Sequence, residues 1–558
     1  MKHRHLFSAC ASGLGLALIL VWLLSGAPFI YAASPHHVAL DCTSVPAPCH
    51  TSLQEAVDAA VTGDVILVAT GVYTGVHARP RPTGYLASPS MTTITQVVLI
   101  NKTIVIRGGY TTAFTEPPDP VANPTTLNAA GQGRVMVIAG YISPTIEGLR
   151  LTHGDAVQQQ GEGGPHDAGG GVYVVSATAT LSNNQIFSNT AYSGGGLYLR
   201  YSATILNGNA ILSNTGSSGG GGLKLIYCDQ AVLKNNFFAA NAAPSAGGLF
   251  VNYSNATTLS GNTIVSNTAT TGLAGGLLLQ VSAATVSQNF ILSNTAETQG
   301  GGAYVFGDDN SVLSGNLISA NSADSGGGLE LYQSDTTLIS NTISANTASN
   351  AALVLYYSNA ALSENIIVSN TAGCGLVMRR SNATLTNTVV TDNRAATTGG
   401  CGLSIVDGSQ PQLVHTTVAR NGGGQGTGVN VSTFASQAAT ATLTNTIVSG
   451  HFWGIYIASG NTAKLEGTLW YSNTVDQYGA GFFISGTAER NYWGDPHFAE
   501  DGYHLLSGSA AIDRGVNTGA LDDIDGDSRP QGGGPDLGAD EVVAFDWYDI
   551  YLPLVIRN

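Results

Sequence analysis

The chain contains 558 residues, of which 43% are apolar and only 10% charged, and its formal net charge at pH 7 is −16. This apolar content can fill a core, which excludes an intrinsically disordered chain even though 71 residues are Gly. The acidic balance and the lack of basic patches argue against nucleic acid as a partner.

Residues 1–32 have the pattern of a secretory signal peptide. Lys2 and Arg4 give a positively charged start, an apolar stretch runs from Leu14 to Leu24, and Ile30-Tyr31-Ala32 offers a cleavage site. An uncleaved membrane anchor is the alternative. No other segment approaches the length of a membrane span, so we expect a mature chain that is secreted or held at the cell surface, with no transmembrane segment.

Residues 33–139 are expected to form an N-terminal cap and the first coils of a repeat structure. Ser52 and Glu55 fit a capping box at the start of a helix with one apolar face. Such a helix would cover the open apolar end of a stack of strands. Cys42 and Cys49 flank a short loop and predict a local disulfide, in keeping with an oxidising compartment.

A unit of about 26 residues repeats through residues 140–494 and predicts a solenoid. One Asn recurs at the same place in each unit: Asn189, Asn214, Asn241, Asn267, Asn294, Asn321, Asn346, Asn370, Asn393 and Asn421. A second Asn stands five residues earlier in the first eight units, from Asn184 to Asn365. Asn side chains at the same corner of successive coils can pair amide to amide and bond the turn backbone, so we expect a ladder.

Each unit also carries a Leu-x-Leu triplet that alternates with period two, as strands do. Leu197-Tyr198-Leu199 and Leu223-Lys224-Leu225 are examples, with the outer residues expected inside and the middle residue outside. Gly triplets such as Gly194 to Gly196 would break a helix but let a strand turn a corner. Coils about 4.8 Å apart, roughly 16 of them, would form a rod about 75 Å long.

This pattern resembles the right-handed parallel β-helix of the pectin-lyase-like superfamily. Ile186 to Asn189, followed by Gly195-Gly196-Leu197, is similar to the repeat of the polymorphic outer-membrane-protein type. The resemblance implies an all-β fold, a right-handed parallel β-helix or β-solenoid with an N-terminal capping helix. It does not imply one function, because this fold carries both enzymes and passive binding surfaces.

Two columns of aromatic residues are expected on the outside of the stack. Tyr198 and Phe250 belong to the middle position of the Leu-x-Leu triplet, and Tyr201, Tyr227 and Tyr253 lie three residues further on. Rings about 5 Å apart could form a platform for sugar rings, so these five residues are candidates for carbohydrate binding. The alternative is that the rings only stabilise the sheet by stacking on each other.

Acidic residues at one turn position give a candidate catalytic pair. Asp309 and Asp335 would lie about 5 Å apart on adjacent coils, the carboxyl separation of retaining glycosidases. They could serve as acid and nucleophile or could hold calcium. Asn359 and Asn382 fill the same position in later coils, which favours an ordinary turn preference. The signatures of polygalacturonases and pectate lyases are missing.

Two further cysteines occupy one position on adjacent coils. Cys374 and Cys401 both precede Gly-Leu, and the expected coil spacing falls within the Cα range of a disulfide. Two stacked free thiols are the alternative. Cys228 has no evident partner and is expected to be buried.

The C-terminal region differs from the repeats. Residues 495–549 hold 13 acidic and 2 basic residues, a net charge of −11. Residues 495–545, an acidic module, resemble the end region of bacterial surface β-helix proteins called choice-of-anchor, from Tyr503-His504-Leu505 to Asp540-Glu541. That resemblance implies an extracellular protein. The apolar tail, 546–558, could be a last capping strand or a sorting signal.

Alternate carboxylates in this module suggest an ion site. Asp523, Asp525 and Asp527 are spaced as in a calcium loop, although Ser528 replaces the Gly of an EF-hand and no Glu follows at position twelve. Calcium is the only cofactor that the sequence suggests, and a solvated acidic turn is the alternative.

Together these patterns predict a secreted or surface-attached, monomeric and non-catalytic β-helix whose face binds a polysaccharide or cell-surface glycan. A polysaccharide lyase or glycoside hydrolase that uses Asp309 and Asp335 is the alternative, and a structural spacer is a third possibility. Short, uniform turns favour a flat binding surface over an enzyme cleft.

Overall fold

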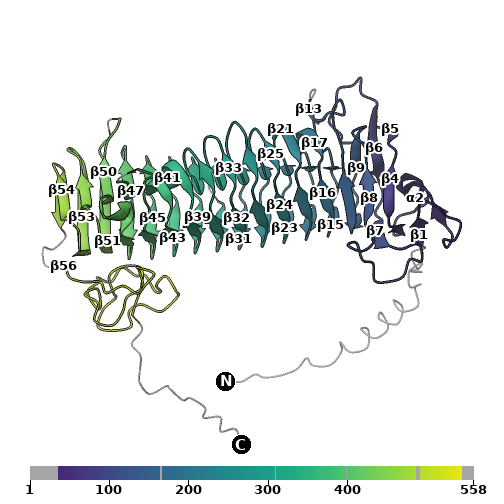
Figure 1. Ribbon diagram of the computed structural model, residues 1–558. Coiled ribbons are helices and arrows are strands. Elements are labelled where there is room, and N and C mark those ends of the chain that lie inside the picture. Colours follow the sequence, from purple (N-terminus) through teal and green to yellow (C-terminus); the bar gives the residue numbers. More distant parts are fainter. Residues whose placement is uncertain are drawn as a thin grey trace, which may run out of the picture.

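The computed structural model is an all-β parallel solenoid of about 17 turns, with about 2% helix (Figure 1). The structure describes residues 35–163, 166–307, 310–397, 399–435, 437–485 and 490–542. The proposed signal peptide and the apolar tail from residue 546 lie outside the described residues.

Each regular coil contains three main strands. In one coil these are β19 (Ile205–Asn207), β20 (Ala210–Leu212) and β22 (Leu223–Ile226). Every strand pairs in parallel and in register with its counterpart one coil on, so that Leu206 pairs with Leu233. The strands therefore form three columns along the solenoid.

The first column contains β7 (Val105–Tyr110), β10 (Thr145–Glu147), β15 (Thr180–Ser182), β19, β23 (Val232–Lys234), β27 (Thr258–Ser260), β31 (Thr285–Ser287), β35 (Val312–Ser314), β39 (Thr337–Ile339), β42 (Ala361–Ser363), β45 (Thr384–Thr386) and β48 (Gln412–Val414). The second contains β8 (Thr125–Asn128), β11 (Leu149–Thr152), β16 (Gln185–Phe187), β20, β24 (Phe237–Ala239), β28 (Thr263–Val265), β32 (Phe290–Leu292), β36 (Leu317–Ser319), β40 (Thr342–Ser344), β43 (Ile366–Val368), β46 (Val389–Thr391) and β49 (Thr417–Ala419). The long strands β51 (Thr440–Ser449) and β53 (Thr462–Tyr471) continue both columns, followed by β55 (Phe482–Ser485) and β56 (Asn491–Trp493).

The third column contains β6 (Thr93–Ile100), β9 (Arg134–Ala139), β14 (Val172–Val175), β18 (Leu197–Arg200), β22, β26 (Leu249–Asn252), β30 (Leu277–Gln280), β34 (Ala303–Phe306), β38 (Leu329–Tyr332), β41 (Thr347–Tyr356), β44 (Thr371–Arg379), β47 (Cys401–Val406), β50 (Thr427–Ser432), β52 (Trp453–Ile457) and β54 (Val475–Gly479). Shorter strands such as β17 (Thr190–Ser193) and β21 (Thr215–Gly219) precede it. Leu197 and Leu199 join the continuous apolar core, as expected, and Tyr198 belongs to a separate outer cluster.

Two Asn ladders run inside the solenoid. The Asn214 side chain donates to the Ile186 carbonyl at 2.8 Å and to the Asn241 Oδ1 oxygen at 3.0 Å, and its own Oδ1 accepts from the backbone and side chain of Asn189. Such buried amides are stable only because every rung satisfies its neighbours. Past Asn421, His451 takes the next rung, and burial lowers its pKa to about 4. The predicted amide pairing is confirmed.

The Gly residues of the repeat are explained by these ladders. A Cβ atom on Gly196 would lie 2.9 Å from the Asn214 amide nitrogen, and one on Gly248 would lie 3.1 Å from the Asn267 side-chain carbon. The added Cβ atoms would lie still closer, 2.5 Å, to a backbone carbonyl oxygen of the next coil, that of Gly222 or Gly276. The requirement is therefore close packing against both the next coil's backbone and the ladder amide, rather than backbone freedom alone.

Helix α2 (Leu53–Ala59) covers the N-terminal end of the stack, so the predicted capping helix is confirmed. The Ser52 hydroxyl accepts from the Glu55 N–H at 3.2 Å, and Leu53 and Val57 enter the solenoid core. Lys102 donates from Nζ to the last carbonyls of the helix, those of Val57, Asp58 and Ala60. A cation at a helix C-terminus satisfies its free carbonyls and opposes its dipole.

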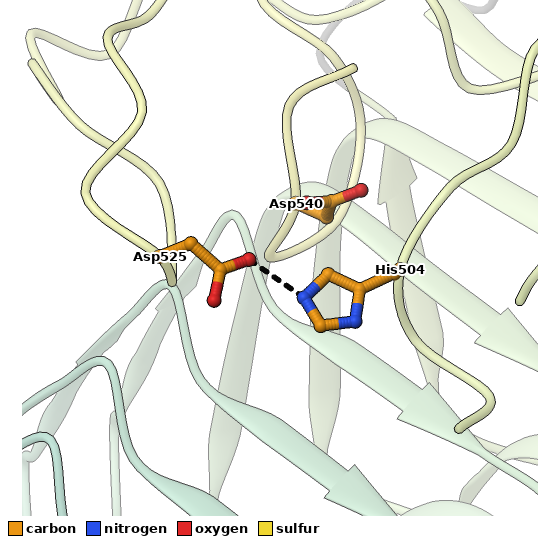
Figure 2. Close-up of side chains that lie close together, drawn as sticks. All are labelled: His504, Asp525 and Asp540. Carbon is orange, nitrogen blue, oxygen red and sulfur yellow. Dashed lines mark hydrogen bonds and ion pairs between the residues drawn. The ribbon is translucent and has the colours of Figure 1, made fainter. Parts of the chain in front are cut away.

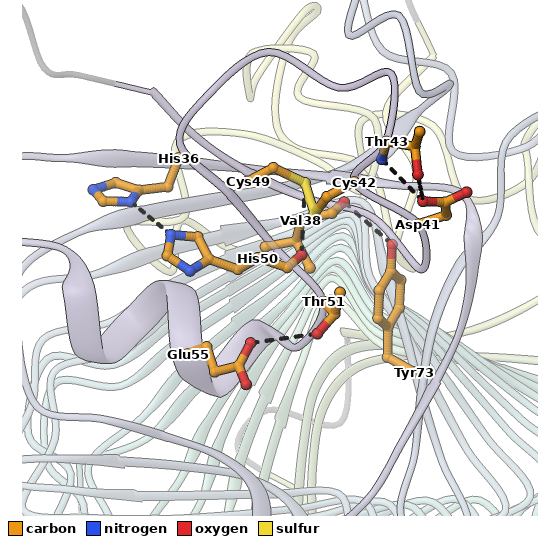
Figure 3. Close-up of a disulfide and its surroundings, with 10 residues drawn as sticks. All are labelled: His36, Val38, Asp41, Cys42, Thr43, Cys49, His50, Thr51, Glu55 and Tyr73. Carbon is orange, nitrogen blue, oxygen red and sulfur yellow. Dashed lines mark hydrogen bonds between the residues drawn. A yellow bond between two sulfur atoms is a disulfide. The ribbon is translucent and has the colours of Figure 1, made fainter.

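Four short elements complete this end: β1 (Pro35–Val38), β2 (Cys49–His50), β3 (Val65–Ala69) and β4 (Gly71–Thr74). Strand β5 (His77–Pro80) runs antiparallel to β6. Figure 3 shows the disulfide between Cys42 and Cys49, with a Cα separation of 5.8 Å, beside Tyr73, whose hydroxyl donates to the Val38 carbonyl.

The described part of the acidic module, residues 495–542, forms no strand and lies against the last coils (Figure 1). Asn445 exchanges two hydrogen bonds with the Val516 backbone, at 2.7 and 2.8 Å. Leu505, Ala511 and Leu537 bury apolar surface against β51 and β53. A buried ion pair between Arg529 and Glu541, at 2.8 Å, holds the centre of the module.

Candidate functional site

In each coil, the residue that follows the strand of the third column lies at a corner of the solenoid. Its side chain can point away from the core. In three successive coils this residue is Tyr201, Tyr227 or Tyr253, with φ of 49°, 54° and 44°. The left-handed region is uncommon for a large side chain. It directs the three rings outward into one column.

The three tyrosines stack on each other along the solenoid. Their ring centroids are 5.4 and 5.5 Å apart and their planes are 12° and 19° from parallel. Arg200 lies over Tyr201 and Tyr227, with its guanidinium carbon 4.7 and 5.3 Å from the ring centroids. These residues are 41–52% exposed although the rings stack on each other.

A shallow groove of about 440 Å³ begins where the tyrosine column stops. Val281 and Gly307 occupy the same corner in the next two coils and leave the space beside Tyr253 open. The groove is lined by Tyr227, Asp229, Tyr253, Asn255, Val281, Ser282, Ala283, Gly307 and Asn310. We call it the tyrosine groove.

The opposite wall of the groove belongs to the row of Asp and Asn turn residues. The Asp229 carboxylate accepts the Asn255 N–H at 2.7 Å, and the Asn255 side chain accepts the Ala283 N–H at 3.1 Å. Further along, Asp335 accepts the Asn359 N–H at 2.6 Å. These side chains cap the turn of the next coil, which is a structural role. Asp309 lies outside the described residues, so its pairing with Asp335 stays a prediction.

The aromatic residues at the middle position of the triplet, Tyr198 and Phe250, do not form a surface platform, and the prediction that Tyr198 lies on the outer surface was wrong. Tyr198 is fully buried and Phe250 is partly buried. The first Gly of each Gly triplet adopts a positive φ and folds the preceding loop onto this column: a Cβ on Gly194 would lie 3.0 Å from the Tyr198 Cβ. The alternation correctly predicts that these residues point away from the core, but a second layer covers them.

Charged side chains also lie in this covered layer. Lys224 pairs with Glu162, and Glu330, 1% exposed, accepts a hydrogen bond from Gln299 at 2.7 Å. Burial raises the pKa of Glu330 to about 7. The period-two pattern places Lys224 and Glu330 outside, and nothing in it indicates that a loop would cover them.

Asp523, Asp525 and Asp527 do not have the calcium-loop arrangement that their spacing predicts. Asp523 is fully buried and gives both carboxylate oxygens to backbone N–H groups, those of Asp525, Asp527 and Glu541. Asp525 instead contacts His504, with 2.6 Å between its Oδ2 and the ring Nε2 (Figure 2). Asp527 is exposed.

Among the described residues, the group that could hold a metal ion is His504, Asp525 and Asp540, whose ligand atoms lie within 4.8 Å of one another. The His504 Nδ1 atom contacts the Asp501 carboxylate at 2.5 Å. Burial opposes a charge on the imidazole, but its hydrogen bonds to Asp501 and Asp525 prevail and raise the pKa of His504. Sequence reasoning missed His504 because no regular spacing links it to the acids.

Comparison with known proteins identifies the central coils. Residues 142–276 and 268–390 match the family model described as a right handed beta helix region. This stretch is a right-handed β-helix. The predicted handedness and membership of the β-helix fold are thereby confirmed. No curated protein matches the chain.

Solved structures with a similar fold are distant from this β-helix. The periplasmic alginate epimerase AlgG is 12% identical, with 68% of this chain and 77% of that chain covered at a TM-score of 0.33. The tailspike protein of E. coli bacteriophage HK620, in complex with a pentasaccharide, is 13% identical, with coverage of 77% and 74% and a TM-score of 0.29. Pectate lyase Pel9A is 12% identical, with coverage of 91% and 97% and a TM-score of 0.24. These values bear on neither substrate nor mechanism.

A second disulfide crosses adjacent coils of the β-helix. Cys374 of β44 pairs in register with Cys401 of β47, and the two sulfurs are bonded with a Cα separation of 4.4 Å. Cys228 is a buried free thiol whose pKa rises to about 12 through burial. In the part of the chain that the structure describes, no helix is long and apolar enough to cross a membrane.

Proposed function

We propose that this β-helix is an extracellular glycan-binding protein and that a polysaccharide lies along the tyrosine groove. The observation that carries the proposal is the break in the tyrosine column, where the end of the stack at Tyr253 adjoins open space lined by Asp229 and Asn255. A sugar ring offers an apolar face for an aromatic ring and hydroxyls for carboxylate and amide groups.

The solenoid suits a polymer better than a small ligand. The groove spans several coils, each displaced from the last by about 4.8 Å, and similar turn positions recur in each. A chain of sugars parallel to the solenoid axis would therefore meet repeated contacts, each weak alone. Avidity along the chain raises the total affinity.

The charges of the groove favour a neutral glycan over a polyuronate. Among the described residues that line it, one is a carboxylate, that of Asp229, and none is Lys or Arg. Arg200 lies over Tyr201 and Tyr227 and is not one of the described residues that line the groove. An anionic polymer in the groove would meet Asp229, with no Lys or Arg among the described lining residues to compensate its charge.

An extracellular location is part of this proposal. Two disulfides, Cys42–Cys49 and Cys374–Cys401, are expected in an oxidising compartment and are rare in the cytosol. Labelling of intact cells with an impermeant reagent would test it. Protection of the chain until the cells are lysed would argue for an internal location.

Affinity electrophoresis on gels that contain neutral polysaccharides (xylan, arabinan, β-glucan) tests the site. We expect Tyr253→Ala, and more so Tyr227→Ala with Tyr253→Ala, to weaken retention at least tenfold, because alanine removes the stacking face. Tyr141→Ala is the matched control, since Tyr141 is 98% exposed and far along the chain from the groove. Equal retention of all variants would refute the groove.

The same panel separates binding from catalysis. An assay of reducing ends and of unsaturated uronate absorbance on each polysaccharide, pectin and alginate included, would reveal a hydrolase or lyase. Activity lost in Asp309→Ala or Asp335→Ala would replace the binding proposal with the enzymatic alternative. Binding without cleavage would support a non-catalytic protein.

A further inference from the structure

We propose that the acidic module contains a zinc-type metal site made of His504, Asp525 and Asp540. The three residues come from separate segments of a module that has no strands, yet their side chains converge (Figure 2). One imidazole nitrogen and two carboxylates are a ligand set that Zn²⁺ accepts. Calcium prefers oxygen ligands alone, so the histidine selects against it.

The second ring nitrogen of His504 supports this assignment. Its Nδ1 atom contacts the Asp501 carboxylate at 2.5 Å, which fixes the ring and directs Nε2 at Asp525. A carboxylate behind a histidine is the usual arrangement around metal-bound imidazoles, because it sets the tautomer and makes the ligand more basic. Asp501 is thus a positioning residue and not a ligand.

Asp540 gives an independent reason for a cation. The residue is 6% exposed, and its Oδ2 oxygen accepts the Leu505 N–H at 2.6 Å. Among the described residues, no donor contacts its Oδ1 oxygen, and no Lys or Arg forms an ion pair with Asp525 or Asp540. His504 is the cationic group beside this buried carboxylate, and burying a charge with so little compensation is costly.

The geometry requires only small movements. In a tetrahedral site with bonds of 2.0–2.2 Å, ligand atoms lie about 3.4 Å apart. The contact from Nε2 to Asp525, now 2.6 Å, would open as the ion displaces the proton between them. Asp525 and His504 have side chains 50% and 30% exposed, so both can shift and a solvent molecule can complete the coordination.

Equilibrium dialysis of the metal-stripped full chain against ZnCl₂, with CaCl₂ in parallel, tests the site. We expect one Zn²⁺ that is bound tightly and lost on His504→Gln or Asp540→Asn, with at least a tenfold weaker Kd. Asp501→Asn should weaken binding roughly 10–100-fold while keeping all three ligands. Asp527→Asn, an exposed acid of the same loop, is the matched control.

Three results would overturn the proposal: no stoichiometric zinc in the wild-type chain, zinc binding that His504→Gln leaves unchanged, or a preference for calcium. If the variants fail to fold, the wild-type chain still decides, because Co²⁺ in place of zinc should give the visible absorption of a low-coordinate nitrogen–oxygen site. Octahedral, water-like Co²⁺ absorption would also overturn it. Failure here leaves the glycan proposal intact, since the tyrosine groove lies many coils away.

Discussion

The regular coils and the acidic module satisfy their buried backbone in opposite ways. In the coils, parallel strands pair in register and uncharged amides such as Asn214 and Asn241 bridge the corners. In the module, carboxylates take that role, since Asp523 accepts three backbone N–H groups and Asp536 accepts those of Asp513 and Val542. In a repeating structure, uncharged amides can satisfy the buried backbone because each finds the same partner one coil away. An irregular chain needs stronger, charged acceptors at individual positions.

This difference gives the two regions different sensitivities. The Asn rungs of the ladders carry no charge and should not respond to pH, and only the His451 rung at the end of one ladder titrates. In the module, burial raises the pKa of Asp536 to about 6, even though its hydrogen bonds oppose the rise. Because the module relies on carboxylate acceptors, its stability should depend on pH and on cations. The stability of the coils should depend on them much less.

The largest loss of stability is expected from a substitution in the middle of an Asn ladder. Asn267→Ala would leave the Asn241 side chain and backbone N–H without their acceptor, at 2.9 and 3.0 Å in the wild type, and the Phe238 carbonyl without its donor. Each buried group left unpaired costs about 1–3 kcal/mol, so a loss of roughly 3–5 kcal/mol is expected. Denaturant unfolding followed by circular dichroism measures it.

The control for this change is Asn382→Ala. Asn382 is exposed at a turn and accepts a single backbone N–H, that of Gln410, at 2.8 Å. Water can replace that hydrogen bond, so a loss below about 1 kcal/mol is expected. Equal losses at the two positions would show that burial of the ladder does not matter to its strength.

One residue of the coils should respond to pH. Glu330 lies in the covered layer with its pKa raised from 4.5 to about 7 by burial, so the folded protein favours the protonated carboxyl. Its contribution to stability is complete below pH 4.5 and is lost as the pH rises through about 7. Glu330→Gln removes the charge and should stabilise the protein by about 1–3 kcal/mol at pH 8.

Melting temperatures of the wild type and Glu330→Gln at pH 4 and pH 8 check this prediction. At pH 4 both side chains are neutral and the two curves should nearly coincide. A variant that is less stable than the wild type at pH 8 would mean that Glu330 is charged and well paired in the folded state.

How much of the structure can be predicted from the sequence also differs between the repeating coils and the irregular acidic module. The ladder of Asn189 and its equivalents is predictable because each rung needs only the same residue one coil away. The burial of Tyr198 is not, since it depends on how a Gly-rich loop folds back over the strand. The convergence of His504 with Asp540 is least predictable, because no periodicity relates segments of an irregular chain.

The smallest loss of stability is expected from a substitution at the interface between the coils and the acidic module. Asn445 donates to the Val516 carbonyl at 2.7 Å and accepts its N–H at 2.8 Å, so Asn445→Ala removes two hydrogen bonds that dock the acidic module. The Asn445 amide also contacts His415 Nε2 of the neighbouring coil at 2.9 Å. We expect a loss of about 1–2 kcal/mol, most of it in the docking of the module. Limited proteolysis should then cut faster within residues 495–542, while the melting temperature of the coils changes little.

Asn235→Ala separates docking from backbone strain. Asn235 occupies the equivalent corner of an uncovered coil, with φ of 54° against 51° for Asn445, so both alanines carry a similar conformational cost. Only the loss at Asn445 should expose the module to protease. If the coils melt earlier in Asn445→Ala than in Asn235→Ala, the module supports the end of the stack, and the two regions form one cooperative unit rather than two.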